Sequence, residues 1–282
     1  MRRSAVCVLL MVVLGGCSGG PAPGSPEATS VPTAIPPSPV TSPQQAQALP
    51  VYYVGETPAG YKLYREFHRV TTSDPASDAV REMLAAPTGT DPDYRSHWPK
   101  GTSLRTHVAV AAGVITVDLT GVGAADVGTE LAAVTVQQLV YTVQGTLQSS
   151  DPVRILVDGK PVAELWGAVA TADPVARGDI YKLRSSIQID APADGATVSR
   201  QFEVSGEASV FEGTVHWEVR RGNAVLRSGF TGSAGGMLTF GGYRFPLELE
   251  PGEYTVRVIA DDPTGGQGIP PASDDKAITV TA

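Results

Sequence analysis

The side chains that could perform acid–base or metal chemistry are few and scattered along this chain of 282 residues. No two of the four histidines share the H-x-x-x-H or H-E-x-x-H spacing with which a helix presents zinc ligands; they are His68, His97, His107 and His216. The Gly-x-Ser-x-Gly pattern occurs once, at Gly16–Gly20, between the N-terminal apolar run and a Pro-rich stretch, so no serine-nucleophile turn between a strand and a helix is recognisable. We therefore expect a protein that is not an enzyme and needs no cofactor.

Carboxylates gather at one place near the C-terminus. Asp261-Asp262 and Asp274-Asp275 flank a single loop. Four carboxylates brought together could bind Ca²⁺, a hard cation that takes oxygen ligands. Their spacing is not that of a known calcium loop, and solvated loop charges are the alternative interpretation. A Gly-rich loop over 121–128 also has two interpretations. It could bind an anion through its backbone N–H groups, or it could be a plain loop in which Thr129 caps the next helix. The acidic Asp126 favours the plain loop.

Cys17 ends an N-terminal segment with three recognisable parts. Arg2 and Arg3 open it, an apolar run over 5–14 follows, and Gly15-Gly16 precede the cysteine. A basic start, a short apolar core and small residues before a cleavage site are typical of a secretory signal peptide. The apolar run is shorter than the ~20 residues that span a bilayer. The only other cysteine, Cys7, lies inside this leader, so the mature chain cannot form an internal disulfide.

The ending Leu14-Gly15-Gly16-Cys17 resembles the bacterial lipobox. This resemblance implies that residues 1–16 are removed and that the Cys17 thiol carries a diacylglycerol. It also implies localisation at the outer, extracytoplasmic face of the cell membrane. Loss of Arg2 and Arg3 lowers the net charge from −8 to −10. A net negative charge of this size disfavours nucleic acid as a partner, and it disfavours binding to anionic lipid through a polybasic segment.

Composition divides the rest of the chain into four parts. After Cys17, residues up to 48 are rich in Pro, Ser and Ala with Glu27 as the only charge, which predicts an extended tether. Residues 49–167 mix strand and helix patterns, 168–184 form a connector, and 185–282 read as all-β. We predict an α+β domain followed by an immunoglobulin-like β-sandwich.

The α+β pattern is clear in its local signals. Strands are predicted at 49–54, 62–70, 104–110, 115–119 and 153–157 from alternating apolar residues. Ser73-Asp74-Pro75 predicts a helix start and Pro87 its end. A second helix is predicted from the helical spacing of its apolar residues, which run from Ala132 to Leu147. The all-β part shows seven short alternating strands between turn dipeptides such as Gly222-Asn223 and Pro251-Gly252.

The α+β domain carries five segments in a characteristic order: Asp78–Leu84 with Pro87, Trp98–Thr102, Gly113–Leu119, Gln137–Thr142 and Val157–Gly159. With these segments it resembles the GerMN domain of sporulation and spore-germination proteins. The all-β domain carries the segments Ile189–Pro192, Phe202–Gly206, Phe211–Val215, and Gly252–Tyr254 with Ala260-Asp261. With these it resembles the immunoglobulin-like domain of bacterial spore-germination proteins.

These resemblances imply a binding or scaffold module in the cell envelope, with sporulation or germination as one setting. The alternative is an accessory factor or minor hydrolase of peptidoglycan. The expected contacts are the membrane, through the lipid anchor, and an unidentified envelope protein or wall polymer. We expect Gln137, Gln138 and Tyr141, on the more polar side of the second helix, to face that partner.

Overall fold

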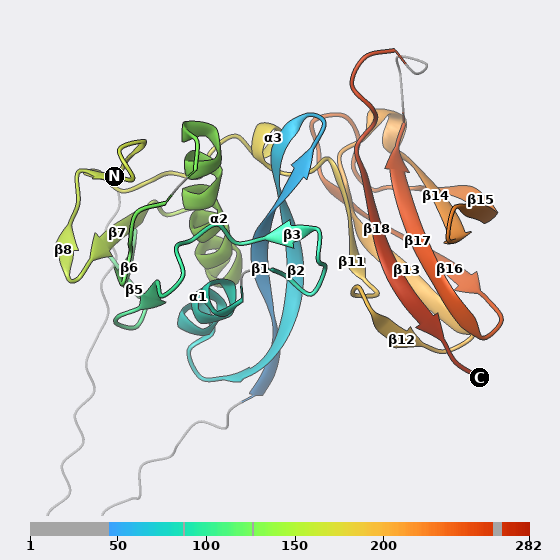
Figure 1. Ribbon diagram of the computed structural model, residues 1–282, viewed down its shortest axis with the longest axis horizontal. Helices are drawn as coiled ribbons and strands as arrows, with labels where there is room; N and C mark the ends of the chain where they lie inside the picture. The colour runs from blue at the N-terminus through green and yellow to red at the C-terminus, as the bar shows by residue number, and fades with distance from the viewer. Residues whose placement is uncertain (1–44, 87, 126, 262–266) are drawn as a thin grey trace, which may run out of the picture. The chain divides into compact units, whose positions relative to one another are not determined.

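The computed structural model describes residues 45–282, except residues 87, 126 and 262–266 (Figure 1). All of these residues belong to one compact unit, Ser42–Ala282. The expected leader lies outside the described residues, as does the tether up to residue 44. The last residues assigned to the tether are not extended linker, because Gln45–Ala48 pair with Arg69–Thr72 as the start of the first strand.

The first domain is built on two sheets. A long antiparallel hairpin, β1 (Gln45–Thr57) and β2 (Gly60–Thr72), joins β3 (Tyr94–Arg95) in the order β2-β1-β3. The second sheet has the order β4-β6-β7-β8 with β5 added against β6, and β6 and β7 run parallel. Its strands are β4 (Ser103–Leu104), β5 (Ala109–Ala111), β6 (Val114–Thr120), β7 (Val153–Val157) and β8 (Lys160–Pro161).

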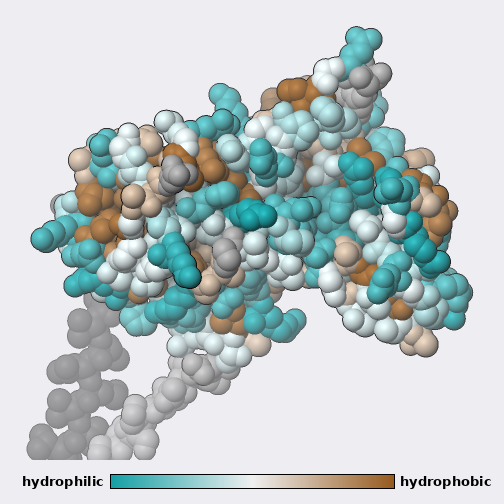
Figure 2. Space-filling view, viewed as in Figure 1, coloured by the Kyte–Doolittle hydropathy of each residue, from teal (hydrophilic) through white to brown (hydrophobic). Residues whose placement is uncertain are grey.

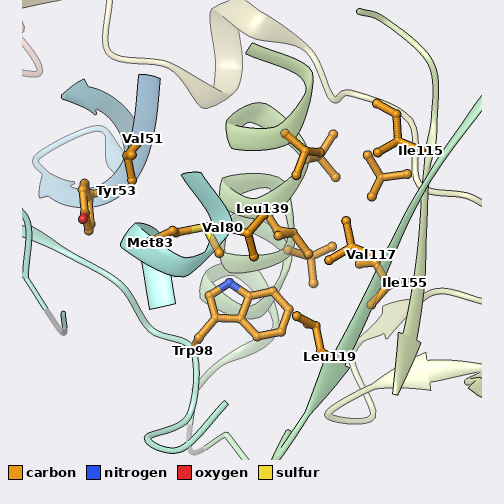
Figure 3. Packing of buried hydrophobic residues seen from close by; sticks show 14 of the residues in the cluster. Val51, Tyr53, Val80, Met83, Trp98, Ile115, Val117, Leu119, Leu139 and Ile155 are labelled. Carbon is orange, nitrogen blue, oxygen red and sulfur yellow. The ribbon is translucent and has the colours of Figure 1, made fainter. Parts of the chain in front are cut away.

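Two helices fill the space between these sheets. Helix α1 (Pro75–Ala85) begins as expected, because Asp74 accepts a hydrogen bond from the Ser77 backbone and Pro75 occupies the first turn. Helix α2 (Thr129–Leu147) lies with Leu139 between β1 and the pair β6 and β7 (Figure 3). The expected cap by Thr129 is wrong: Gly128 is the N-cap, without a side-chain hydrogen bond, and Thr129 is already helical.

The core of this domain joins side chains from both sheets and both helices. Val51 and Tyr53 contribute from β1, Met83 from α1, Leu139 from α2 and Ile155 from β7, all essentially inaccessible to solvent (Figure 3). The predicted strand over 104–110 is interrupted, because Val108 donates its backbone N–H to Ser77 Oγ on α1 and not to a neighbouring strand.

The predicted connector is not a free linker. The strand β9 (Glu164–Leu165) lies just before it and pairs with β10 (Val169–Ala170) inside it, and the short helix α3 (Ile180–Leu183) lies near its end. Between the last two elements Val175 exchanges backbone hydrogen bonds with Val153 of β7. The segment is therefore folded onto the first domain for most of its length.

The second domain is a sandwich of two sheets. One has the order β11-β13-β16 and the other the order β12-β18-β17-β14-β15. The strands are β11 (Ile187–Ala191), β12 (Ala196–Val198), β13 (Gln201–Ala208), β14 (Thr214–Arg221), β15 (Ala224–Gly232), β16 (Gly241–Glu248), β17 (Gly252–Ala260) and β18 (Ser273–Val280), with a 3₁₀ turn at Phe211–Gly213. Val204, Val219 and Val256 mark a core of its own between the sheets.

The surface seen in Figure 2 is mostly hydrophilic, with hydrophobic areas in separate patches on both domains. In the described part of the chain, no helix is both long enough and apolar enough to cross a membrane.

Candidate functional site at the domain junction

A buried cluster of charges joins the two domains. Lys276 of β18 places its Nζ 2.5 Å from Asp91 Oδ2, 2.7 Å from the Tyr94 hydroxyl and 3.0 Å from Asp274 Oδ1. Tyr94 also donates to Asp274, whose other oxygen accepts the backbone N–H of Ile189 at 2.6 Å. The side chains of Lys276, Asp91 and Asp274 are at most 5% exposed. We call Asp91, Tyr94, Asp274 and Lys276 the junction cluster.

Strand alternation and one capped loop position this cluster. Successive strand residues point to opposite faces, so Asp274 and Lys276 turn inward while Asp275 turns out. From the first domain, Glu66 accepts the backbone N–H groups of Thr90 and Asp91, at 2.8 and 2.9 Å. Glu66 is itself bonded to His68, which also bonds Glu82. Glu66 thus fixes the loop that contains Asp91, and this loop places the Asp91 carboxylate in the junction cluster.

A second set of ion pairs supports the same junction. Arg65 of β2 lies 2.6 Å from Asp190 and 3.3 Å from Glu207, both in the second domain. Arg184 contacts Glu207 at 2.8 Å and lies over the ring of Phe240. Because a buried charge is costly unless it is paired, these contacts favour one relative arrangement of the two domains.

A cleft of about 670 Å³ opens beside the junction cluster. Both domains line it: Tyr64 and Arg95 come from the first domain, Arg257 and Asp275 from the second, and Arg184 from the connector. The Nε atoms of Arg184 and Arg257 are buried and have no hydrogen-bond partner among the described residues. Clefts of this size at domain interfaces are common ligand sites. The lining carries charges of both signs, stacked tyrosines and hydroxyl groups, which suits a polar ligand.

The protonation states of the junction cluster follow from its burial. Burial raises the pKa of Asp274 to about 6, although Lys276 and the hydrogen bonds from Ile189 and Tyr94 oppose the shift. Burial works against the ammonium group of Lys276, but the carboxylates of Asp274 and Asp91 outweigh it and raise the pKa of Lys276. Burial, together with Asp274, raises the pKa of Tyr94 well above its usual value, so Tyr94 remains a hydrogen-bond donor. Lys276 therefore holds its charge between two carboxyl groups at neutral pH.

The structure corrects the expected partner face on α2. Gln138 and Tyr141 are buried, and Gln138 donates from Nε2 to the Tyr52 carbonyl of β1 at 2.8 Å. Gln137 and Tyr141 bind the backbone of Ala176 and Gly178 in the connector. The expectation is wrong because α2 is covered by β1 and by the connector, so its polar side chains serve internal hydrogen bonds.

The proposed calcium ligands do not converge where they can be placed. Asp274 is held in the junction cluster, Asp275 lies on the opposite face of β18, and Asp261 lies 3.5 Å from His216. Asp262 lies outside the described residues, as does Cys17. Within the described ranges, no group of three or more His, Cys, Asp or Glu side chains could hold a metal ion. The calcium site thus has no support from the residues that can be placed.

The aromatic side chains Trp98 and Tyr243 make internal contacts. Trp98 is buried in the first core with its ring edge against Trp166. Tyr243 donates its hydroxyl to the Gln188 carbonyl inside the second domain. The junction cluster was not predicted from the sequence. The alternation along the last strand, in which positions 274, 276, 278 and 280 point inward, is the pattern that indicates burial of Asp274 and Lys276.

Comparison with known families divides the chain at the same place as the fold. A model described as Germane, sporulation and spore germination, matches residues 50–163. A model described as Gmad2, the immunoglobulin-like domain of bacterial spore germination, matches residues 186–267. The chain carries a Germane domain followed by a Gmad2 domain. Neither family description names an enzymatic activity. Among curated proteins, no match was found.

Solved structures match parts of this chain at low sequence identity. The tandem GerMN domains of the sporulation protein GerM from Bacillus subtilis share 16% identity at a TM-score of 0.38, over 52% of this chain and 50% of that chain. The present chain thus spans about half of that structure. The first GerMN domain of the same protein shares 17% identity at a TM-score of 0.36, over 46% of this chain and 99% of that chain. A candidate lipoprotein from Clostridium perfringens shares 17% identity at a TM-score of 0.33, over 51% of this chain and 97% of that chain.

Proposed function

We propose that this protein is a lipid-anchored module of the cell envelope that binds a partner outside the membrane and catalyses no reaction. The Germane and Gmad2 domains support an envelope role connected with sporulation or germination. The leader that ends in Leu14-Gly15-Gly16-Cys17 supports anchoring at the outer face of the membrane.

The observation that carries the binding role is the cleft beside the junction cluster. Buried ion pairs hold the Germane and Gmad2 domains together, so the cleft between them has a defined shape before any ligand arrives. A preformed site loses less conformational entropy on binding than two freely moving domains would. The ligand is an envelope protein or wall polymer that presents polar groups to Arg95, Arg257 and the neighbouring carboxylates.

Cross-linking in intact membranes, followed by affinity capture, tests this function. Arg95→Glu reverses a charge on the cleft, and Arg69→Glu makes the same change at an exposed position on β2 outside the cleft lining. We expect Arg95→Glu to lose the captured partner and Arg69→Glu to retain it. Equal capture by both variants would contradict binding at the cleft.

Purified protein incubated with peptidoglycan tests the alternative. We expect no release of soluble fragments over time. Release that disappears when a single Asp, Glu or His is replaced would instead show that the protein is a hydrolase.

A further inference from the structure

Large exposed apolar side chains are concentrated on the edge strand β15 of the Gmad2 domain and on the turn that follows it. Among the described residues, ten large hydrophobic side chains are exposed, and half of them lie between positions 225 and 238: Val225, Leu226, Phe230, Met237 and Leu238. Phe230 is 77% exposed and Met237 is 69% exposed. Figure 2 shows hydrophobic surface at this edge, where Figure 1 places β15. We call these five residues, with Arg227 and Arg244, the β15 surface.

The turn after β15 presents two of these side chains under backbone strain. Gly236 and Thr239 exchange two backbone hydrogen bonds at 3.0 Å, so Met237 and Leu238 form the tip of a tight turn. Leu238 has a φ of 61°, a conformation that Gly or Asn adopts at lower cost. Leu238 is 63% exposed although its carbonyl accepts the hydroxyl of Tyr181 in α3. The fold therefore holds this turn in place and presents the apolar side chain of Leu238 to solvent.

The charges around the β15 surface are opposite in sign to the protein as a whole. Residues 219–247 contain four arginines and no carboxylate side chain, in a chain whose net charge is −8. Arg220 pairs with Glu218, whereas Arg221 donates to the Tyr254 hydroxyl and Arg227 to the Glu248 backbone carbonyl. Arg244 lies beside Thr231, whose hydroxyl donates to the Arg244 carbonyl. The segment that carries the β15 surface is therefore basic in sequence, with Glu218 and Glu248 at its two ends.

Exposed apolar side chains beside arginines match the chemistry of an anionic phospholipid bilayer. The apolar side chains can enter the interface while arginines contact the phosphate groups. The chain outside the described residues ends at such a bilayer if Cys17 is lipidated. Residues 18–44 could then extend to roughly 80 Å at about 3.1 Å per residue, which allows the folded unit to reach back to the membrane. Tethering also raises the effective concentration of the bilayer, so that weak contacts are populated.

We propose that the β15 surface docks the Gmad2 domain onto the anionic leaflet to which the chain is anchored. The reach of the domain to that leaflet rests on the proposed lipid anchor, whereas the affinity of the surface for lipid does not. Docking would hold the folded unit at a fixed orientation near the membrane.

Vesicle co-sedimentation of the unlipidated chain from Ser18 to Ala282 tests this docking. One set of vesicles contains phosphatidylcholine with about one third phosphatidylglycerol, and the other contains phosphatidylcholine alone. We expect binding to the anionic vesicles that weakens with added salt. Met237→Ser with Leu238→Asn should lower the partition coefficient by about tenfold or more, because two apolar side chains are lost. Arg244→Gln should lower it by about fivefold.

Two controls fix the location of the effect. Val110→Ser alters an exposed apolar residue on β5 of the Germane domain, and Arg69→Gln removes an exposed arginine from β2; neither should change binding. Circular dichroism checks that each variant is folded. Lack of binding by the parent chain, or equal loss in the Val110→Ser control, would overturn the proposal.

Sedimentation without vesicles separates lipid from a second copy of the chain. Self-association that the Met237 and Leu238 substitutions abolish, without vesicle binding, would show a protein interface and overturn bilayer docking. Vesicle binding by the unlipidated chain, together with a Cys17 that carries no lipid in cells, would support the surface and contradict the anchor.

Discussion

Replacing Lys276 by Met removes the charge at the centre of the junction cluster while keeping most of the apolar stem. The ammonium group lies within 3.0 Å of Asp91, Tyr94 and Asp274. Without it, two carboxyl groups with side chains at most 5% exposed have no cationic partner among the residues that the structure describes. Breaking a buried pair in this way costs about 3–5 kcal/mol, against at most about 1 kcal/mol for an exposed pair.

The loss should depend on pH with a sign that the structure defines. Burial already raises the pKa of Asp274 to about 6, above its value in the unfolded chain. A carboxyl group with a raised native pKa makes the free energy of unfolding fall as pH rises through that range. Loss of Lys276 raises the native pKa of Asp274 further, since its largest attractive partner is gone. The deficit of Lys276→Met should therefore be larger at pH 8 than at pH 5.

Urea denaturation followed by circular dichroism at both pH values measures these effects. Because the two domains have separate cores, a single unfolding transition requires that the junction couples them. We expect one transition for the parent chain and two transitions for Lys276→Met. Lys160→Met, at an exposed end of β8, should change the free energy of unfolding by less than about 0.5 kcal/mol. A Lys276→Met deficit below about 1 kcal/mol at pH 8, with no pH dependence, would refute the reasoning.

Three further predictions follow from local contacts. The hydrogen bond to Glu66 raises the pKa of His68. Protonated His68 therefore contributes its full stabilisation of the folded protein below about pH 6.5, and this contribution is lost as pH rises through the raised pKa. In urea titrations, His68→Gln should remove this fall in the free energy of unfolding with pH. Gln138→Ala should lower the free energy of unfolding by about 1–3 kcal/mol, because the Tyr52 carbonyl loses its buried donor, and an unchanged midpoint would contradict this. Gly229→Ala would place a Cβ 2.4 Å from the Trp217 ring and should cost about 1–3 kcal/mol with a changed near-UV spectrum, whereas Gly232→Ala has no atom within 4 Å and should be neutral.

Helices and strands could be predicted from the sequence where their signals depend on neighbouring residues. The alternation in β1, β2, β6 and β17 depends only on neighbouring residues, and the Asp74-Pro75 start of α1 is a local hydrogen-bonding choice. The order of an α+β domain and a sandwich followed from these patterns and from the resemblances. The interruption of the strand near Val108 could not be predicted locally, because Ser77 of a distant helix captures its N–H group.

The candidate site was predicted poorly because its residues meet only in three dimensions. Asp91 and Lys276 are 185 positions apart, and nothing local indicates that they pair. Gln137, Gln138 and Tyr141 were assigned to a partner face because polar side chains on a helix usually face solvent. The better signal was that α2 also carries apolar residues on its other sides, which is typical of a helix buried all round.

Anchoring of a binding module through Cys17 is tested most directly by cell fractionation of the Cys17→Ser variant. The leader ending at Gly16 predicts that the parent protein is cleaved, carries lipid on Cys17 and sediments with membranes. Two or more acyl chains anchor a protein stably, whereas the β15 surface alone gives only reversible binding. We expect Cys17→Ser either to remain as uncleaved precursor or to be released from membranes by a high-salt wash. A variant that is processed normally and stays on salt-washed membranes would contradict lipid anchoring.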